Sequence, residues 1–404
     1  MDSLDKLADV ATHMNLEPTG EPTLIQPKLG FDQTVTACGA VIKKDPIHSP
    51  LGRSIGELGI SKAAVAGGKT IPLLKTMMTT ACERNCFYCP FRAGRSSMRR
   101  QTFKPEEMAK AFMQVHKAGK AKGLFLSSGI IKGSVTTQDK IIETADILRN
   151  KYRFRGYIHL KVMPGVEKDQ IRRSMELASR LSVNLEAPND KRLHMLAPKK
   201  EFVRELVRPL QWMDEIRKNE LAHNSWNGRW ASSVTQFVVG AVGESDLELL
   251  STSERMIKMY KLQRVYYSAF SPIRDTPFEE LTAENPMRQH RLYQSSFLFR
   301  DYGYDLEEMP FDQQGNLPLG EDPKMAWAKR NLRENPAEIN TADRQALLRI
   351  PGVGPKGADK ILQARRRGTI SEVRHLQQLG VVTRRMEPYV LLNGRRPERQ
   401  LRLF

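Results

Sequence analysis

The sequence is poor in cysteine and has no long hydrophobic segment. Only four of its 404 residues are cysteine. No run of about 18 apolar residues occurs, which excludes a conventional membrane-spanning helix. Residues 1–6 lack the basic-then-apolar layout of a secretory signal. We therefore expect a cytoplasmic protein without a membrane partner.

Acidic side chains are the minority among the charged residues. The chain has 46 Asp and Glu against 64 Lys and Arg, which gives a formal net charge of +18 and a pI of about 9.8. This balance favours a polyanionic partner, most commonly nucleic acid and less commonly an anionic membrane surface; a merely basic solvated surface is the alternative. The hydrophobic content of 40% is enough for a full core, and the length allows two or more domains.

Three of the four cysteines lie within eight residues, at Cys82, Cys86 and Cys89, in the pattern C-x3-C-x2-C. Three thiolates can hold three corners of a [4Fe–4S] cluster and leave one iron with an open coordination site. We predict such a cluster, in which Cys38 takes no part. The alternatives are a zinc site completed by a distant His or Cys, and a disulfide pair, which the absence of a secretory signal disfavours.

The spacing, with an aromatic residue just before the last cysteine, resembles the signature of the radical SAM superfamily. The resemblance implies that S-adenosylmethionine binds the open iron and that an external electron donor such as flavodoxin or ferredoxin reduces the cluster. It also implies that Tyr88 contacts the adenine, the alternative being packing over the cluster. Arg84 lies close enough in sequence to stabilise an anionic cluster, although a solvated position is an equal alternative.

From Lys69 onward, short apolar runs alternate with helical stretches, which is typical of parallel βαβ units. We expect six strands, at 71–78, 123–126, 156–162, 181–185, 234–239 and 265–269. The intervening helices are expected at 105–117, 138–151, 168–179, 199–219 and 246–261. The fold class is therefore α/β, an open barrel of six such units with catalytic residues at the strand C-termini. The resemblance implies the same architecture, a partial (βα)6 TIM-like barrel of the radical SAM type.

Two of these strand ends carry glycine turns. Ser127, Ser128 and Gly129 follow the second strand, where the superfamily has a Gly-Gly-Glu-like stretch that meets the methionine amino group; here the acidic residue is missing. An ordinary strand-to-helix turn is the alternative. Gly243 belongs to the turn after the fifth strand, which is similar to the family's G-x-I-x-G-x-x-E segment, where the backbone meets adenine.

The fourth strand runs into Asn184 and Glu186, a polar pair inside an apolar run. Burying a carboxylate without a partner is costly, so the pair indicates a binding role. The resemblance assigns to this strand end the ribose and carboxylate contacts of the cofactor. His159 and Lys161 share one face of the third strand, and either is a candidate for the methionine carboxylate or for the substrate.

We divide the chain into four segments. Residues 1–68 are read as a loop-rich N-terminal extension with one short helix near 4–14, and residues 69–275 as the barrel. Residues 276–335 are a connecting region to which the sequence assigns no role. Residues 336–404 form a separate small all-α unit, with fourteen Lys and Arg against six Asp and Glu and hence a net charge of +8.

This last unit contains residues 347–362, which resemble a helix-hairpin-helix motif. Gly352 and Gly354 bend the chain and Pro355 begins the next helix, so that backbone amides can meet a phosphate, with Lys356 and Lys360 adding charge. Residues 379–385 look like a second, degenerate hairpin. Such units bind the DNA backbone without reading bases; a protein-contact module is the alternative.

Together, the barrel and the basic tail resemble the radical SAM proteins associated with DNA modification or repair that carry a C-terminal helix-hairpin-helix domain. The resemblance implies reductive cleavage of S-adenosylmethionine to methionine and a 5′-deoxyadenosyl radical that abstracts hydrogen from substrate. One alternative is a radical SAM enzyme that modifies RNA, such as transfer RNA bases. The other is a DNA-binding or glycosylase-type protein with a structural cluster, although in those proteins four cysteines follow the hairpin.

Overall fold

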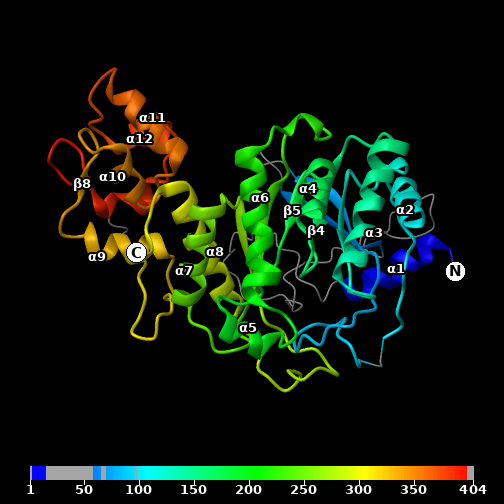
Figure 1. Cartoon of the computed structure of the whole chain (residues 1–404). Helices are drawn as coiled ribbons and strands as arrows, with labels where there is room; N and C mark the ends of the chain where they lie inside the picture. Colours follow the sequence, from blue (N-terminus) through cyan, green and yellow to red (C-terminus); the bar gives the residue numbers. More distant parts are fainter. Residues whose placement is uncertain (1, 15–57, 65–69, 96–97, 398–404) are drawn as a thin grey trace. The chain divides into compact units, whose positions relative to one another are not determined.

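The structure, a computed structural model, describes residues 2–14, 58–64, 70–95 and 98–397. The chain divides into two compact units (Figure 1). The first consists of Met1–Glu244 and Met256–Glu284, and the second of Ser245–Arg255 and Asn285–Phe404. Among the described residues, no helix is both long and apolar enough to span a membrane.

The first unit is built on a seven-stranded sheet whose spatial order follows the sequence. Its strands are β1 Ile60–Ala64, β2 Thr70–Met77, β3 Gly123–Ser127, β4 Tyr157–Lys161, β5 Arg180–Ser182, β6 Ser232–Val239 and β7 Arg264–Ala269. β1 pairs antiparallel with β2, and all the later neighbours pair in parallel. This curled sheet confirms the α/β class and the partial TIM-like barrel.

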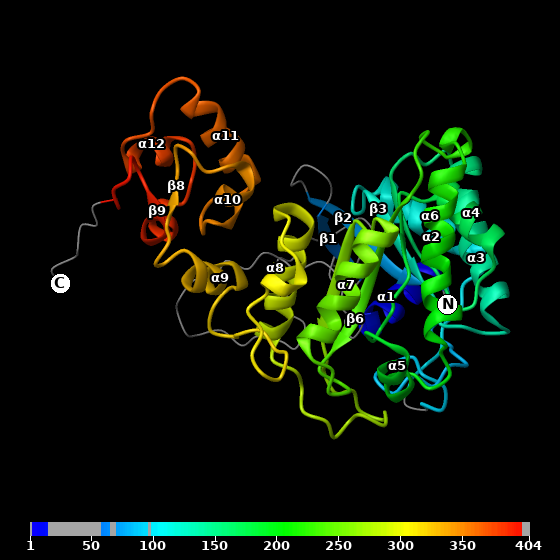
Figure 2. The same cartoon turned by 60° about the vertical axis from the view of Figure 1, so that its left-hand side comes forward.

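Helices cover the outer face of the sheet. Figure 1 shows α2, α3, α4 and α6 one after another along it, and in Figure 2 the same helices lie together on one side of the strands. The helices of this unit are α1 Ser3–Met14, α2 Pro105–Lys117, α3 Ser134–Asp146, α4 Lys168–Leu177, α5 Asp190–Leu196 and α6 Arg208–Asn219, and α7 Asp246–Tyr260 crosses into the second unit. Leu124, Leu126, Ile158 and Leu160 are fully buried. The alternate residues Phe125 and His159 pair in the ladder, with ring centroids 4.7 Å apart.

Two elements differ from the sequence expectation. β1 lies within residues 1–68, which were read as a loop-rich extension, and α1 packs against β2. The helix expected over 199–219 begins instead as a π-helix, Phe202–Val207, before α6. Pro209 has no N–H to donate to the carbonyl four residues earlier, so the regular α-helical pattern is interrupted there. A second π-helical turn, Ile147–Lys151, continues α3.

The second unit is mainly helical. Its helices are α8 Pro286–Tyr302, α9 Pro323–Asn331, α10 Arg344–Arg349, α11 Pro355–Arg365, α12 Val373–Gln378 and α13 Thr383–Met386. A short parallel pair, β8 Ala337–Glu338 and β9 Val390–Leu391, closes its C-terminal part. Leu347, Ile350, Val353, Ile361 and Leu376 belong to its buried core.

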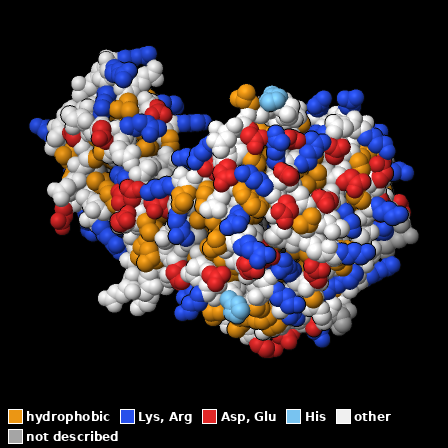
Figure 3. Space-filling view, in the orientation of Figure 1, with side chains coloured by type: hydrophobic (Ala, Val, Ile, Leu, Met, Phe, Trp, Pro, Cys, Tyr) orange, Lys and Arg blue, Asp and Glu red, His pale blue; other side chains and the backbone are white. Residues whose placement is uncertain are grey.

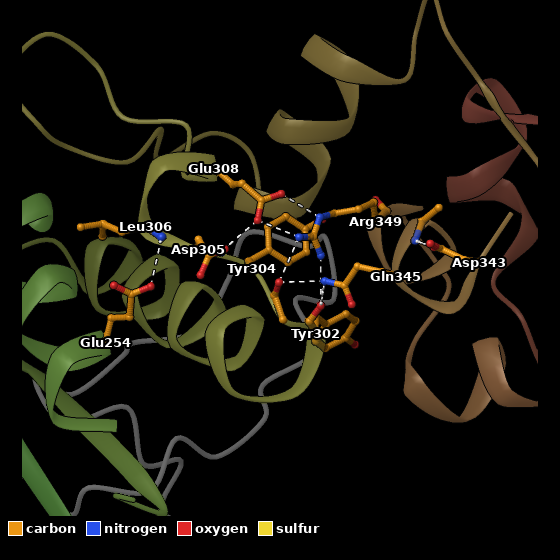
Figure 4. Close-up of polar contacts among 11 residues, drawn as sticks. Glu254, Tyr302, Tyr304, Asp305, Leu306, Glu308, Asp343, Gln345 and Arg349 are labelled. Carbon is orange, nitrogen blue, oxygen red and sulfur yellow. Dashed lines mark hydrogen bonds and ion pairs between the residues drawn. The ribbon is translucent and has the colours of Figure 1, made fainter. Parts of the chain in front are cut away.

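Residues from the expected connecting region pack with the C-terminal helices in this unit. The side chain of Arg349 on α10 donates to the carbonyls of Tyr302 and Gly303 at the end of α8, and Gln345 donates to the same two carbonyls. Arg349 also forms an ion pair with Glu308, at 2.7 Å (Figure 4). The second compact unit, which consists of Ser245–Arg255 and Asn285–Phe404, therefore contains residues on both sides of the predicted boundary at 335.

Candidate functional site at the carboxyl ends of the strands

The three clustered cysteines lie on the loop that follows β2. All three are free thiols; Cys86 is buried, while Cys82 and Cys89 are partly exposed. Backbone hydrogen bonds hold this loop against its neighbours, since Glu83 N donates to Ile130 O at 2.7 Å and Phe87 N donates to Leu196 O at 2.9 Å. The loop thus contacts the segment that follows β3 and the C-terminal end of α5.

Two of the cysteine sulfurs accept backbone hydrogen bonds. Ile130 N lies 3.4 Å from Cys82 Sγ, and Phe91 N lies 3.4 Å from Cys89 Sγ. Such N–H groups stabilise negative charge on sulfur and tune iron–sulfur clusters. For Cys86, burial raises the pKa of the thiol while the charge of Lys200 opposes that rise. A bound metal would therefore supply most of the driving force for ionising this buried thiol.

This donor set fits a [4Fe–4S] cluster. Free cysteines on one loop, N–H groups directed at two sulfurs and nearby cations suit anionic thiolates. Among the described residues, no three or more His, Cys, Asp or Glu side chains are arranged so that they could bind a single metal ion. A cubane makes a different demand, because each thiolate binds its own iron. Cys38 lies outside the described residues, so its predicted exclusion from the site stays a prediction.

Gly129 allows the segment after β3 to approach the cysteine loop. A Cβ atom at this position would lie 2.1 Å from Ala81 O and 3.2 Å from Cys82 Cβ. Gly129 N donates to Thr79 O at 2.7 Å, which fixes the contact. Glycine is therefore required here for the close approach itself, and that approach brings Ile130 N to Cys82.

Ser127 and Ser128 precede this contact. Ser127 is the buried last residue of β3. Ser128 is partly exposed, and its hydroxyl donates to Gly129 O at 2.6 Å. Both precede Gly129, which contacts the cysteine loop. Their contact with a cofactor stays a prediction.

Glu186 lies in a buried polar cluster close to the cysteines. Its carboxylate pairs with Lys200 Nζ at 3.0 Å and accepts a hydrogen bond from Tyr88. Burial alone would raise the pKa of Glu186, but the charges of Lys200 and Lys161 lower it below its usual range. Burial raises the pKa of Tyr88. The predicted residues Tyr88 and Glu186 are thus brought into direct contact, and Glu186 is ionised at neutral pH.

The backbone of Glu186 is unusual as well. Its φ of +64° lies in the left-handed region, which few residues other than glycine adopt. Backbone hydrogen bonds to β6 hold it there, since Glu186 N donates to Gln236 O and Val238 N donates to Glu186 O. Strained conformations that the surroundings enforce are concentrated at functional sites.

The other predicted cofactor residues are more dispersed. Asn184 is buried in the extension of β5. Gly243 is exposed, with φ of +69°, in the turn after β6, and Arg192 from α5 donates to the neighbouring Val242 O at 2.8 Å. Glu244 accepts hydrogen bonds from the turn amides of Gly240 and Val242. Its carboxylate therefore holds the turn after β6 in place.

Sequence reasoning missed the partners that fix this site. Arg84 pairs with Glu205 of the π-helix Phe202–Val207 at 2.7 Å and donates to Lys199 O, so that the cysteine loop is tied to the segment carrying Lys200. Lys200 itself was not predicted. The only local signal was the pair of lysines following Pro198, which does not reveal that one of them is buried.

His159 and Lys161 take the positions that the strand pattern indicated, and Lys161 pairs in the ladder with Ser182. His159 is buried, and burial together with Arg180 lowers its pKa well below the usual range. Its Nε2 has no hydrogen-bond partner among the described residues, nor does the Ser182 hydroxyl. Neither feature identifies a ligand.

The predicted DNA-binding residues all lie around the turn between α10 and α11. Gly352 has φ of +87°, and a Cβ there would lie 2.3 Å from Val382 O in the turn between α12 and α13. Gly354 is the N-cap of α11 and has an ordinary φ of −101°, so Gly352 alone makes the tight bend. Lys356 is exposed, and exposed Lys360 donates to Leu379 O at 3.0 Å, which joins the two helix pairs.

Several solved structures resemble part of the chain. The FeFe-hydrogenase maturase HydG from Carboxydothermus hydrogenoformans aligns with 13% identity over 56% of this chain and 50% of its own, with a TM-score of 0.43. Methylornithine synthase PylB aligns with 15% identity over 56% and 61%, with a TM-score of 0.44. A radical SAM methyltransferase from Sphaerobacter thermophilus aligns with 15% identity over 60% and 70%, with a TM-score of 0.41. The chain thus spans about half the length of HydG. No curated protein matches the sequence.

A family model supplies the stronger finding. The model described as the Radical SAM superfamily matches residues 76–255, the segment that contains Cys82, Cys86, Cys89 and Glu186. Enzymes of this family use a [4Fe–4S] cluster and S-adenosylmethionine. The chain therefore carries a radical SAM superfamily domain at residues 76–255.

Proposed function

We propose that this protein is a radical SAM enzyme that acts on DNA, with Cys82, Cys86 and Cys89 holding the cluster. When bound, the cluster and S-adenosylmethionine supply reductive cleavage of the latter to methionine and a 5′-deoxyadenosyl radical, which abstracts hydrogen from substrate. An external donor such as flavodoxin or ferredoxin supplies the electron. The role of the chain is to bind, orient and exclude water.

Particular residues would perform that role. Glu186 is held ionised by Lys200 at the carboxyl end of β5, where it can accept hydrogen bonds from a ribose. Gly129 and Ile130 bring the segment after β3 to Cys82. These groups come from different strands and converge at the cysteine loop, which is where active sites of parallel β/α barrels lie.

The observation that carries the nucleic-acid proposal is a repeated turn in the second unit. α10 and α11 are joined through Gly352, and α12 and α13 through Gly380; both glycines have positive φ, +87° and +82°. Buried Val353 and Val381 follow them. The sequence predicts a degenerate second hairpin at residues 379–385, a stretch that includes the turn between α12 and α13. Two such turns resemble a tandem helix-hairpin-helix arrangement.

A recess beside the first turn adds support. A cavity of about 280 Å³ is lined by Gln294, Phe297, Leu298, Tyr302, Asp322, Lys324, Gly352, Val353, Gly354 and Arg385. The first amides of α11 have no partner within their own helix, and its N-terminus lies at this recess. Lys324 donates to Val353 O at 2.6 Å, which ties α9 to the turn, and the cation of Arg385 on α13 also lines the recess. Positive charge and free amides together suit a phosphate.

Exposed basic side chains flank both turns. Lys356 lies in the first turn of α11, and Arg384 occupies the equivalent position in α13. On the face shown in Figure 3, Lys and Arg side chains are interspersed with Asp and Glu over both units. Phosphate contacts would therefore depend on a few positioned groups rather than on one continuous basic surface.

DNA binding of the full-length protein tests this proposal. Affinity for duplex DNA should fall with salt by about 0.9 log units per log unit of salt for each neutralised phosphate. The double variant Lys356→Ala/Arg384→Ala should reduce that slope by about 2. The matched control Lys329→Ala/Arg344→Ala removes two exposed cations already paired with Glu321 and Asp359, and should keep the slope of the wild type.

Product analysis decides between DNA and the RNA alternative. The anaerobically reduced protein would be incubated with S-adenosylmethionine and either duplex DNA or structured RNA, followed by mass spectrometry of the nucleic acid and of 5′-deoxyadenosine. We expect a modified DNA product. Modification of RNA alone would replace DNA by RNA as the substrate. If the wild type and the Lys356→Ala/Arg384→Ala variant bound duplex DNA equally well, the two glycine turns would no longer support the DNA proposal.

A further inference from the structure

Arg100 closes the base of the cysteine loop. Its Nη1 donates to Thr80 O at 2.6 Å and to Phe91 O at 3.0 Å. Its Nη2 donates to Arg92 O at 2.9 Å and to Arg95 O at 3.0 Å. One side chain thus joins the segment before Cys82 to the segment after Cys89. The rigid, five-donor fork of arginine suits such multiple contacts.

The charge of Arg100 has no carboxylate partner among the described residues. Its oxygen acceptors are all neutral carbonyls, and its remaining contact is Met98 Sδ at 3.6 Å. Arg84, the other arginine that ties this loop, differs because its guanidinium pairs with Glu205. A paired carboxylate cancels most of the electric field that a cation exerts on more distant groups, whereas neutral carbonyl dipoles do not. Arg100 therefore contributes more positive potential to its surroundings than Arg84 does.

This charge acts on the cysteines directly. Burial lowers the pKa of Arg100, and the negative charges of Cys82 and Cys89 act in the opposite direction. Phe91, whose carbonyl Arg100 holds, donates its own N–H to Cys89 Sγ. Arg100 therefore both positions a donor to the sulfur and contributes a positive potential there.

We propose that Arg100 is a positioning residue that closes the cysteine loop and, through a charge that no carboxylate of the described residues neutralises, raises the reduction potential of the cluster held by Cys82, Cys86 and Cys89. Adding one electron from an external donor makes the cluster and its thiolates more negative. A neighbouring cation in a partly buried site therefore stabilises the reduced form more than the oxidised form. This inference rests on the proposed cluster site.

Redox titration monitored by the electron paramagnetic resonance of the reduced cluster tests it in the full-length, anaerobically reconstituted protein. In Arg100→Gln, the ratio of reduced to oxidised cluster at a fixed potential should fall about tenfold, which for a one-electron couple is a shift of about 59 mV to lower potential. Arg100→Lys retains the charge and should stay closer to the wild type, while binding less iron because the fork is lost.

Arg149 offers a matched control. It is buried, and it also donates to backbone carbonyls, those of Leu177, Phe154 and Gly156. Those carbonyls precede the N-terminal ends of β4 and β5, so Arg149 lies at the opposite end of the parallel strands from the cysteines. Arg149→Gln should lower stability without moving the potential of the cluster.

A second pair of variants covers the case in which Arg100→Gln binds no cluster. Met98 is buried and contacts Arg100, so Met98→Glu would place a carboxylate against the guanidinium while the loop contacts remain. Met98→Glu should lower the potential relative to the neutral Met98→Gln. Equal potentials in wild type and Arg100→Gln would overturn the inference. If Arg100→Gln binds no cluster, equal potentials in Met98→Glu and Met98→Gln would overturn it instead. A wild-type protein without a cluster would instead overturn the proposed site, which the iron content reports separately.

Discussion

Lys200 Nζ lies 3.0 Å from Glu186 Oε1, and both side chains are almost fully buried, with exposed fractions of 9% and 6%. Each charge therefore depends on the other, because a lone buried ion is strongly disfavoured. Tyr88 donates to the same carboxylate. The pair lies beside the cysteine loop, so the candidate site contains a fixed negative charge that Lys200 compensates before any ligand binds.

Lys200→Met should lower the free energy of unfolding by about 3–5 kcal/mol, because it leaves the Glu186 carboxylate buried and unpaired. Urea unfolding at neutral pH measures the change. Lys199→Met is the control, since Lys199 is exposed and contributes only its backbone carbonyl to Arg84. The double variant Glu186→Gln/Lys200→Met should recover part of the loss. A Lys200→Met protein as stable as the wild type would contradict the coupling of the two charges.

Gly129→Ala should prevent most of the iron from binding while the chain still folds. The new Cβ would meet Ala81 O at 2.1 Å, so the segment after β3 must retreat and carry Ile130 N away from Cys82 Sγ. Iron and sulfide analysis after anaerobic reconstitution measures the effect. Gly320→Ala is the control, because a Cβ there meets nothing within 4 Å. Full cluster content in Gly129→Ala would show that the close approach is dispensable.

Arg349→Met should destabilise the second unit by about 3 kcal/mol. The change leaves Glu308 unpaired and removes the donors to Tyr302 O and Gly303 O at the end of α8 (Figure 4). It also removes the cation from the face of the Tyr304 ring, whose centroid lies 3.8 Å away. Hydrogen exchange in the last turn of α8 should become faster.

Arg344→Met provides the comparison for Arg349. Arg344 is also on α10, but it is exposed and pairs only with exposed Asp359. Exposed pairs contribute about 0–1 kcal/mol, so this variant should behave almost as the wild type. If Arg349→Met and Arg344→Met changed the rate of hydrogen exchange in α8 equally, the contacts of Arg349 with the end of α8 would not explain the change.

The stability of the second unit should rise with pH above neutrality through Lys324. Burial lowers its pKa to about 7, with Asp322 opposing the shift and Arg385 and Arg349 adding to it; Tyr302 presents its ring, whose centroid lies 4.6 Å away. The folded state then binds fewer protons than the unfolded state above pH 7, so the free energy of unfolding increases up to the ordinary lysine range near pH 10.4.

Urea unfolding of wild type and Lys324→Met between pH 7 and pH 9 checks this sign. The stability of the wild type relative to the variant should increase over that interval. Lys329→Met serves as the control, since Lys329 is exposed and pairs with Glu321. A difference between wild type and Lys324→Met that is constant with pH would mean that Lys324 stays charged in the folded protein.

The features that the sequence determined are local ones. The spacing of Cys82, Cys86 and Cys89 places three thiols on one loop in any fold, and the alternation of apolar and helical segments indicated the parallel strands from β2 to β7. Pro355 at the start of α11 and glycine in the preceding turn likewise act over a few residues. β1 was missed because its five residues, ISKAA, include only one β-branched residue and show no alternation of apolar and polar positions.

Tertiary structure decided which distant residues meet. Only the folded chain brings Lys200 to Glu186, Glu205 to Arg84 and Arg100 to both ends of the cysteine loop. It also showed that α8 and α9 pack in the unit that contains the two glycine turns. In sequence, Lys199 and Lys200 are equivalent; burial distinguishes them, because a charge removed from water needs a partner that only the packing of other elements supplies.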